Sequence, residues 1–127
     1  MADIKTFHDL QVWQKAHQLV LLIYKITSTF PTHELYALVS QMRRATVSVA
    51  SNIVEGFRRH SVNDSIHFYN IAEGSLEELK YQLLVSHDLH YIDDEQYVNA
   101  QRLAEEVGKL LYSWKKSQRE NTKKNNG

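Results

Sequence analysis

Apolar side chains recur along most of this chain at spacings of three and four residues, which is the period of an α-helix. Four such stretches occur, over about residues 9–28, 34–58, 62–90 and 95–117. One proline and four glycines are the only strong helix breakers in 127 residues, so the stretches are long and their connections short. The pattern predicts an all-α protein, folded as an antiparallel up-down-up-down four-helix bundle.

The first stretch carries two neighbouring apolar stripes. Their members are Leu10, Trp13, Ala16, Val20 and Ile23 in one stripe, and Val12, Leu19, Leu22 and Ile26 in the other. A helix that is apolar on two sides is usually buried on two sides. In so small a bundle, the second stripe predicts a contact with another subunit.

Short polar side chains mark where three of the helices begin. Thr32 is the expected N-cap of the second helix, and Asp93 or Asp94 that of the fourth. Ser61 and Asp64 have the spacing of a capping box at the start of the third helix. Connections of only a few residues follow, which makes consecutive helices antiparallel neighbours.

The second helix departs from a simple amphipathic pattern because one of its rows is polar. That row consists of Gln41, Arg44, Ser48, Asn52 and Glu55. On the third helix Ser75 and Glu78 are its expected partners, and Gly74 beside them predicts close packing of the two helices. We favour a structural polar network, including an Arg–Glu ion pair, that sets the register of the two helices. A polar pocket for a ligand is the alternative.

Composition excludes several classes of protein. The chain has no cysteine, which removes disulfides, thiolate metal sites and a cysteine nucleophile. No apolar run reaches the roughly 18 residues of a membrane span, and the first residues lack the pattern of a secretion signal. We therefore expect a cytoplasmic protein with no membrane partner.

Charge is balanced overall but unevenly distributed. The net charge is zero, yet residues 1–59 carry seven Lys/Arg against four Asp/Glu, residues 60–112 three against ten, and residues 113–127 five against one. Such asymmetry favours self-association or an anionic partner. Residues 118–127 are polar and rich in Asn and Lys, and we expect them to form a disordered basic C-terminal tail after a four-helix domain of residues 1–117.

Two clusters of cations are candidates for contact with nucleic acid. They comprise Arg43, Arg58, Arg59, Lys115 and Lys116. Exposed cations suffice for salt-dependent phosphate binding, although solvated helix ends account for such clusters more often. No motif with base-reading geometry accompanies them.

Catalytic and metal-binding patterns are weak. His87 and His90 lie three residues apart at a helix end, but the chain has no Glu-x-x-His pair of the kind that carboxylate-bridged metal bundles use. We predict no catalytic residue, no metal and no cofactor, and hence no enzyme. The alternative is an uncharacterised enzyme that uses a polar cluster of Arg44, Glu55 and Glu78.

Several segments between about residues 7 and 114 together resemble a known family. They are Phe7-x-x-Leu10-x-Val12-Trp13-x-Lys15-Ala16, Tyr24-x-x-Thr27-x-x-Phe30-Pro31-x-x-Glu34-x-Tyr36-x-Leu38, Gln41-x-Arg43-Arg44-Ala45-x-x-Ser48-x-x-x-Asn52-Ile53-x-Glu55-Gly56 and Ala72-x-Gly74-Ser75-x-x-Glu78-Leu79. This set resembles the bacterial four-helix-bundle family of 23S rRNA intervening-sequence proteins, which are relatives of the accessory variability determinant of diversity-generating retroelements.

The resemblance implies a four-helix bundle that assembles into a ring-like homopentamer. The accessory variability determinant, which is a basic protein, binds nucleic acid and reverse transcriptase. Most members of the intervening-sequence family have no established activity. We therefore expect a non-enzymatic oligomeric binding or scaffold protein whose partner is RNA or a nucleic-acid-bound protein. A purely structural protein-interaction ring without nucleic acid affinity is the alternative, because the net charge of this chain is zero.

Overall fold

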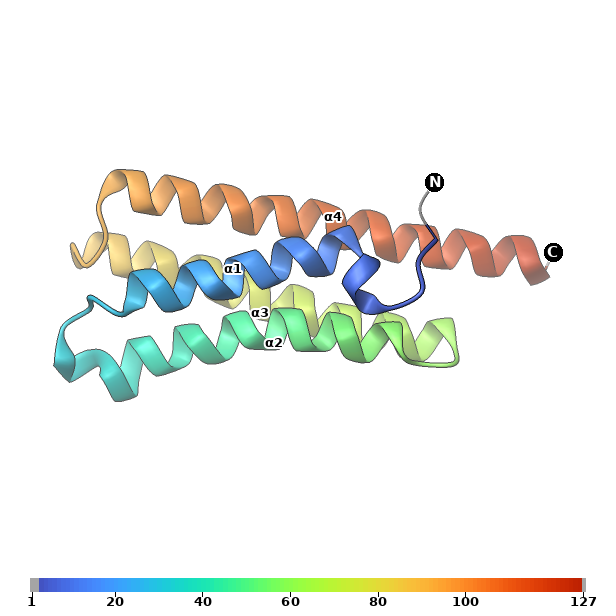
Figure 1. Cartoon of the computed structure of the whole chain (residues 1–127), viewed down its shortest axis with the longest axis horizontal. Coiled ribbons are helices and arrows are strands. Elements are labelled where there is room, and N and C mark those ends of the chain that lie inside the picture. Colours follow the sequence, from blue (N-terminus) through green and yellow to red (C-terminus); the bar gives the residue numbers. More distant parts are fainter. Residues whose placement is uncertain (1–2, 127) are drawn as a thin grey trace.

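The computed structural model describes residues 3–126, with side chains as far as Asn121, and it confirms the all-α four-helix bundle. The helices are α1 (Gln11–Thr27), α2 (Ser40–Phe57), α3 (Val62–Asp88) and α4 (Asp94–Asn126). Their directions alternate along the chain (Figure 1). Each helix packs on the next and α1 also packs on α4, so the four helices form a square in cross-section. The α1–α2 side of this square is opposite the α3–α4 side.

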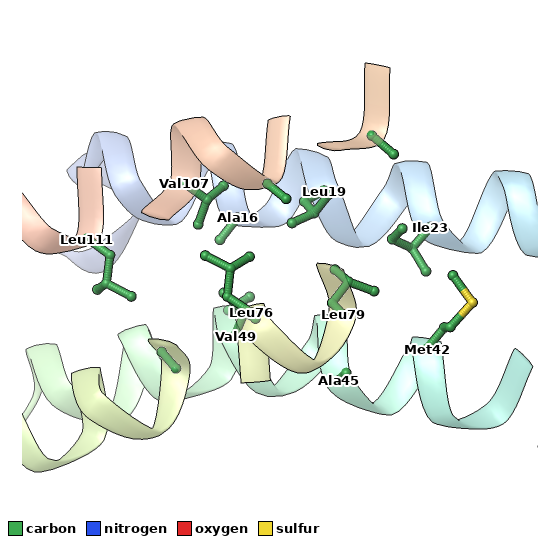
Figure 2. Packing of buried hydrophobic residues seen from close by; sticks show 14 of the residues in the cluster. Ala16, Leu19, Ile23, Met42, Ala45, Val49, Leu76, Leu79, Val107 and Leu111 are labelled. Carbon is green, nitrogen blue, oxygen red and sulfur yellow. The ribbon is translucent and has the colours of Figure 1, made fainter. Parts of the chain in front are cut away.

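All four helices contribute to one apolar core. Figure 2 shows Ala16, Leu19 and Ile23 of α1 pointing toward the side of Met42 and Val49 of α2. Leu76 and Leu79 of α3 and Val107 and Leu111 of α4 belong to the same cluster. Both apolar stripes of α1 pack within the single chain, because their members are buried or half-buried there. The second stripe therefore does not mark a subunit contact, which corrects the expectation from the sequence.

The segment before α2 does not begin with the predicted Thr32 cap. Residues Thr32–Glu34 form a 3₁₀ turn, and Leu35–Val39 form one turn of π-helix that runs directly into α2. The Tyr91 hydroxyl donates a hydrogen bond of 2.9 Å to Oε2 of Glu34, which ties this segment to the α3–α4 turn. This bond to a carboxylate raises the pKa of Tyr91.

Two of the predicted caps are present. The Ser61 hydroxyl accepts a 3.1 Å hydrogen bond from the backbone N–H of Asp64 at the start of α3. At the start of α4, Oδ1 of Asp93 accepts from the N–H of Gln96 at 2.8 Å, and Oε1 of Gln96 accepts from the N–H of Asp93 at 3.0 Å. This reciprocal pair is a capping box and identifies Asp93 as the cap.

The end of α3 carries a backbone conformation that is unusual for its residue. His90 has φ of 63° and lies just after α3. The N–H of Tyr91 donates to the carbonyl of Ser86 at 2.9 Å, and the N–H of His90 donates to that of His87 at 3.0 Å. These two bonds define a Schellman motif, in which glycine is the usual residue at the left-handed position.

Helix α4 continues past Ser117 to Asn126, where the sequence predicted a disordered tail. No glycine or proline lies between Lys109 and Asn126. The Lys, Arg, Gln and Glu residues of this segment have high helix propensity, so the helix can continue in solvent. Its C-terminal end projects beyond the α2–α3 turn (Figure 1). Residue 127 lies outside the described part. Within residues 3–126, no helix combines the length and apolar character needed to cross a membrane.

Two glycines differ in what surrounds them. Gly56 lies inside α2, where a Cβ atom would be 2.3 Å from Cε1 of the buried Tyr69. Gly74 lies inside α3 with open space where its Cβ would be. Helices α2 and α3 do pack closely beside Gly74, where Ser48 and Ser75 are in contact, but Gly74 itself does not face α2. The glycine that a close contact requires is Gly56.

Candidate functional site

The polar row of α2 meets α3 at one point. The hydroxyls of Ser48 and Ser75 are hydrogen-bonded at 2.7 Å across the two helices. Asn52 donates from Nδ2 to the carbonyl of Ser48 at 2.8 Å and to its hydroxyl at 3.0 Å. These three half-buried side chains form the interhelical polar network that the sequence predicted, in a smaller version.

The charged members of the row do not join this network. Arg44, Gln41 and Glu78 are exposed, and among the described residues neither Arg44 nor Glu78 takes part in an ion pair. The expected Arg44–Glu78 pair is thus not formed. Instead, both side chains line a solvent-open cavity of about 350 Å³ between α2 and α3, which we call the α2–α3 pocket. Its lining residues are Tyr36, Ser40, Gln41, Arg44, Ala45, Ser48, Ser75 and Glu78.

Glu55 takes no part in this pocket. Its Oε2 pairs with Nη2 of Arg59 at 2.9 Å and with Nη1 of Arg58 at 3.4 Å, both within one turn of the chain. The structure therefore does not assemble the cluster of Arg44, Glu55 and Glu78 that an enzymatic reading requires.

Sequence reasoning missed two contributors to the pocket. Gln82 is buried and donates from Nε2 to Oε1 of Glu78 at 3.2 Å, which orients that carboxylate. Tyr36 stands at the rim with 93% of its surface exposed. Both were detectable, since Gln82 follows Glu78 by four residues, and Tyr36, Ser40 and Arg44 also recur at spacings of four.

The structure corrects the prediction that Lys115 contacts nucleic acid. Lys115 is only 8% exposed and points between α3 and α4. Its Nζ lies 2.6 Å from Oε1 of Glu73 and 2.7 Å from Oδ1 of Asn70. The neighbouring Lys116 is exposed on the outer side of α4. Of this adjacent pair, only Lys116 is available to a phosphate.

Arg43 is also occupied within the bundle. Its guanidinium lies 4.6 Å from the centre of the Tyr24 ring, and its Nε donates to the hydroxyl of Thr27 at 3.1 Å. These contacts bind α2 to the end of α1. Arg43 is half-buried, so it serves helix packing first.

Arg58 and Arg59 lie at the α2–α3 turn. Both are exposed, although each shares the carboxylate of Glu55, and Arg59 also stacks on Phe68 at 4.4 Å. Lys116 lies at the same end of the bundle, because Trp114 and Gln118 on either side of it in α4 line one hollow with Arg59. The available cations from the predicted set therefore gather at one end.

His87 and His90, the two histidines noted in the sequence, have different roles in the structure. His87 stacks on Tyr97 with ring centres 4.5 Å apart, and its Nε2 lies 2.6 Å from Oδ1 of Asp94. His90 holds the left-handed position after α3. Among the residues described, no three His, Asp or Glu side chains are grouped so as to hold a metal ion.

Comparison with known proteins gives a family and similar solved structures. The model of the family described as 23S rRNA-intervening sequence protein matches residues 8–113. A crystal structure from Bacteroides thetaiotaomicron VPI-5482, of a protein with unknown function from the S23 ribosomal protein family, is similar with a TM-score of 0.77. The two sequences are 27% identical over 83% of this chain and 95% of that chain. Among curated proteins no match was found.

Proposed function

The chain belongs to the 23S rRNA-intervening sequence protein family, and we propose that it is a non-enzymatic binding module that assembles from several copies of itself. The observation that carries this proposal is a pair of exposed apolar faces on opposite sides of the bundle. Each face leaves large apolar side chains on the surface of a helical domain, which is typical of protein interaction sites.

The first surface, the α1–α2 face, surrounds a shallow hollow of about 500 Å³. Its exposed apolar members are Tyr24, Leu35, Tyr36 and Val47. Arg43 and Arg44 lie in the same hollow and make the face basic. An acidic apolar surface would be complementary to it.

Such a surface lies on the other side of the square, on the α3–α4 face. Its exposed apolar members are Tyr81, Leu84, Val98 and Tyr112. A groove of about 840 Å³ between α3 and α4 is lined by Glu73, Glu77 and Glu105. Lys80 and Lys109 line it too, and Lys80 pairs with Glu77, so the lining keeps an excess of one negative charge. Since residues 60–112 carry ten acidic against three basic residues, this face complements the α1–α2 face of a second copy.

Contact between two different faces is heterologous, and repetition of a heterologous contact closes into a ring when the rotation allows. The assembly we propose is the homopentamer that the family resemblance implies. Gel filtration coupled to light scattering tests it at micromolar concentration. Val47→Glu should reduce the measured mass without loss of helical signal, whereas Ile4→Glu, a control at an exposed apolar side chain outside both faces, should not. A clean monomer for the unmodified chain would contradict the proposal.

RNA is the partner we propose for the cationic end formed by Arg58, Arg59 and Lys116. A gel-shift titration with salt should give an affinity that falls as salt rises. The Arg58→Glu/Arg59→Glu variant should bind more weakly and with a shallower salt slope. Lys25→Glu, at an exposed lysine near the other end of the bundle, serves as the control.

The second candidate is the same ring without nucleic acid affinity. Zero net charge favours it, and so does the pairing of Arg58 and Arg59 with Glu55. Absence of any shift at low salt would select this alternative. The assembly measurement is independent of that outcome.

A further inference from the structure

We propose that the α2–α3 pocket binds a small zwitterion of the free α-amino acid class. Two side chains of opposite charge line this pocket. Arg44 and Glu78 line one cavity from two different helices, yet neither is engaged in an ion pair with any described residue. A ligand with both signs of charge would satisfy the two groups at once.

The geometry assigns each end of the ligand to one helix. The guanidinium of Arg44 can hold a carboxylate through two parallel hydrogen bonds. The Glu78 carboxylate is held by Gln82 at 3.2 Å and can accept from an ammonium group. Because the pocket carries one charge of each sign, an anion alone would gain from Arg44 but be repelled by Glu78.

The floor of the pocket supplies preorganised polar groups. Asn52 donates to the Ser48 hydroxyl at 3.0 Å, so that hydroxyl can donate its own proton to Ser75 at 2.7 Å. Either hydroxyl of this pair can be the donor, and when Ser48 donates, the Ser75 proton is available to a ligand oxygen. Gln41 adds an amide at the wall, with both donor and acceptor capacity.

Size and rim also fit a small molecule. A volume of about 350 Å³ lies at the lower end of the range of roughly 300–1,000 Å³ for ligand pockets. The exposed ring of Tyr36 at the rim provides an apolar surface for the side chain of an amino acid. Every residue that the proposal uses comes from one chain. Because Tyr36 and Arg44 also belong to the α1–α2 face, a bound amino acid and a second copy of the chain would compete for these two side chains.

Binding is tested on the full-length chain by calorimetric titration with each standard free L-amino acid at millimolar concentration. The tightest binder is then compared with its methyl ester, which lacks the carboxylate, and its N-acetyl form, which lacks the ammonium. We expect each derivative to bind about tenfold more weakly or worse, as loss of one charged hydrogen-bonded partner implies. Inorganic phosphate should bind more weakly than the amino acid.

Variants then assign the two ends. Arg44→Gln should weaken the free amino acid about tenfold while leaving the affinity for its ester unchanged, because Arg44 contacts only the carboxylate. Arg58→Gln, at an exposed arginine outside the pocket, should change neither affinity. The proposal is overturned if no amino acid binds, if the ester or phosphate binds as tightly as the free form, or if Arg44→Gln leaves the affinity intact. Light scattering on the same samples reports assembly separately.

Discussion

Replacement of Gly56 by alanine tests the tightest backbone approach in the bundle. An added Cβ would lie 2.3, 2.8 and 2.9 Å from Cε1, Cδ1 and Cζ of Tyr69, against an ordinary carbon–carbon contact of about 3.5–4.0 Å. Tyr69 is only 1% exposed, so its ring can move aside only by shifting against the side chains that bury it. Overpacking of this kind costs about 1–3 kcal/mol.

The same substitution also improves helix propensity by about 1 kcal/mol. Because the clash is severe, we expect the free energy of unfolding of Gly56→Ala to fall by about 1–2 kcal/mol net. Gly74→Ala is the matched control, since it makes the same chemical change in a helix interior where nothing lies within 4 Å. It should stabilise by about 1 kcal/mol, which separates the two variants by about 2–3 kcal/mol.

Urea denaturation followed by far-ultraviolet circular dichroism measures both variants. All samples need one protein concentration, because self-association would make apparent stability depend on concentration. A Gly56→Ala variant as stable as Gly74→Ala would refute the reasoning. A double-mutant cycle between positions 56 and 69 gives a second check. Tyr69→Leu should lower the free energy of unfolding less in the Gly56→Ala variant than in the unmodified chain, because the smaller side chain relieves the clash.

Three further outcomes are expected, each read by urea denaturation. Lys115→Met should destabilise by about 1–2 kcal/mol because it leaves Asn70 and the half-buried Glu73 without their shared donor, whereas Lys116→Met should stay within about 0.5 kcal/mol. Equal effects of the two would contradict the burial of Lys115. His90→Gly should stabilise by about 1 kcal/mol, since the left-handed backbone disfavours a side chain, and a loss of stability would show that the imidazole matters more. Burial raises the pKa of Tyr69 above its ordinary value of 10.0, so the folded state holds its proton more tightly. Stability should therefore fall as pH rises above about 10, and Tyr69→Phe should lose less than the unmodified chain over the same interval.

The sequence by itself determined the helices, most of their ends and the core. A period of 3.6 residues in the apolar positions dictates which face of a helix is buried, whatever lies opposite. Capping is equally local, which is why Ser61 and Asp93 were predictable from neighbouring residues. The extension of α4 was missed because polar composition predicts solvent exposure more directly than it predicts loss of helix.

Only the tertiary structure decided which of two similar residues has which role. Lys115 and Lys116 are adjacent and identical in type, yet one is buried against Glu73 and the other is exposed. Gly56 and Gly74 differ only in whether the ring of Tyr69 lies opposite. In both pairs the difference comes from an atom on another helix, whose distance no local pattern specifies.

The polar row of α2 also shows which features the sequence determined and which the tertiary structure decided. Its spacing on α2 placed Arg44 and Ser48 on one face, and the sequence left open whether that face was a sealed network or a pocket. The distance between α2 and α3 settled the choice, because the two helices approach closely enough for Ser48 and Ser75 to hydrogen-bond at 2.7 Å, while Arg44 and Glu78 stand apart across a cavity. Helix separation is set by the packing of the whole core, which is a property of the folded chain and not of any one segment.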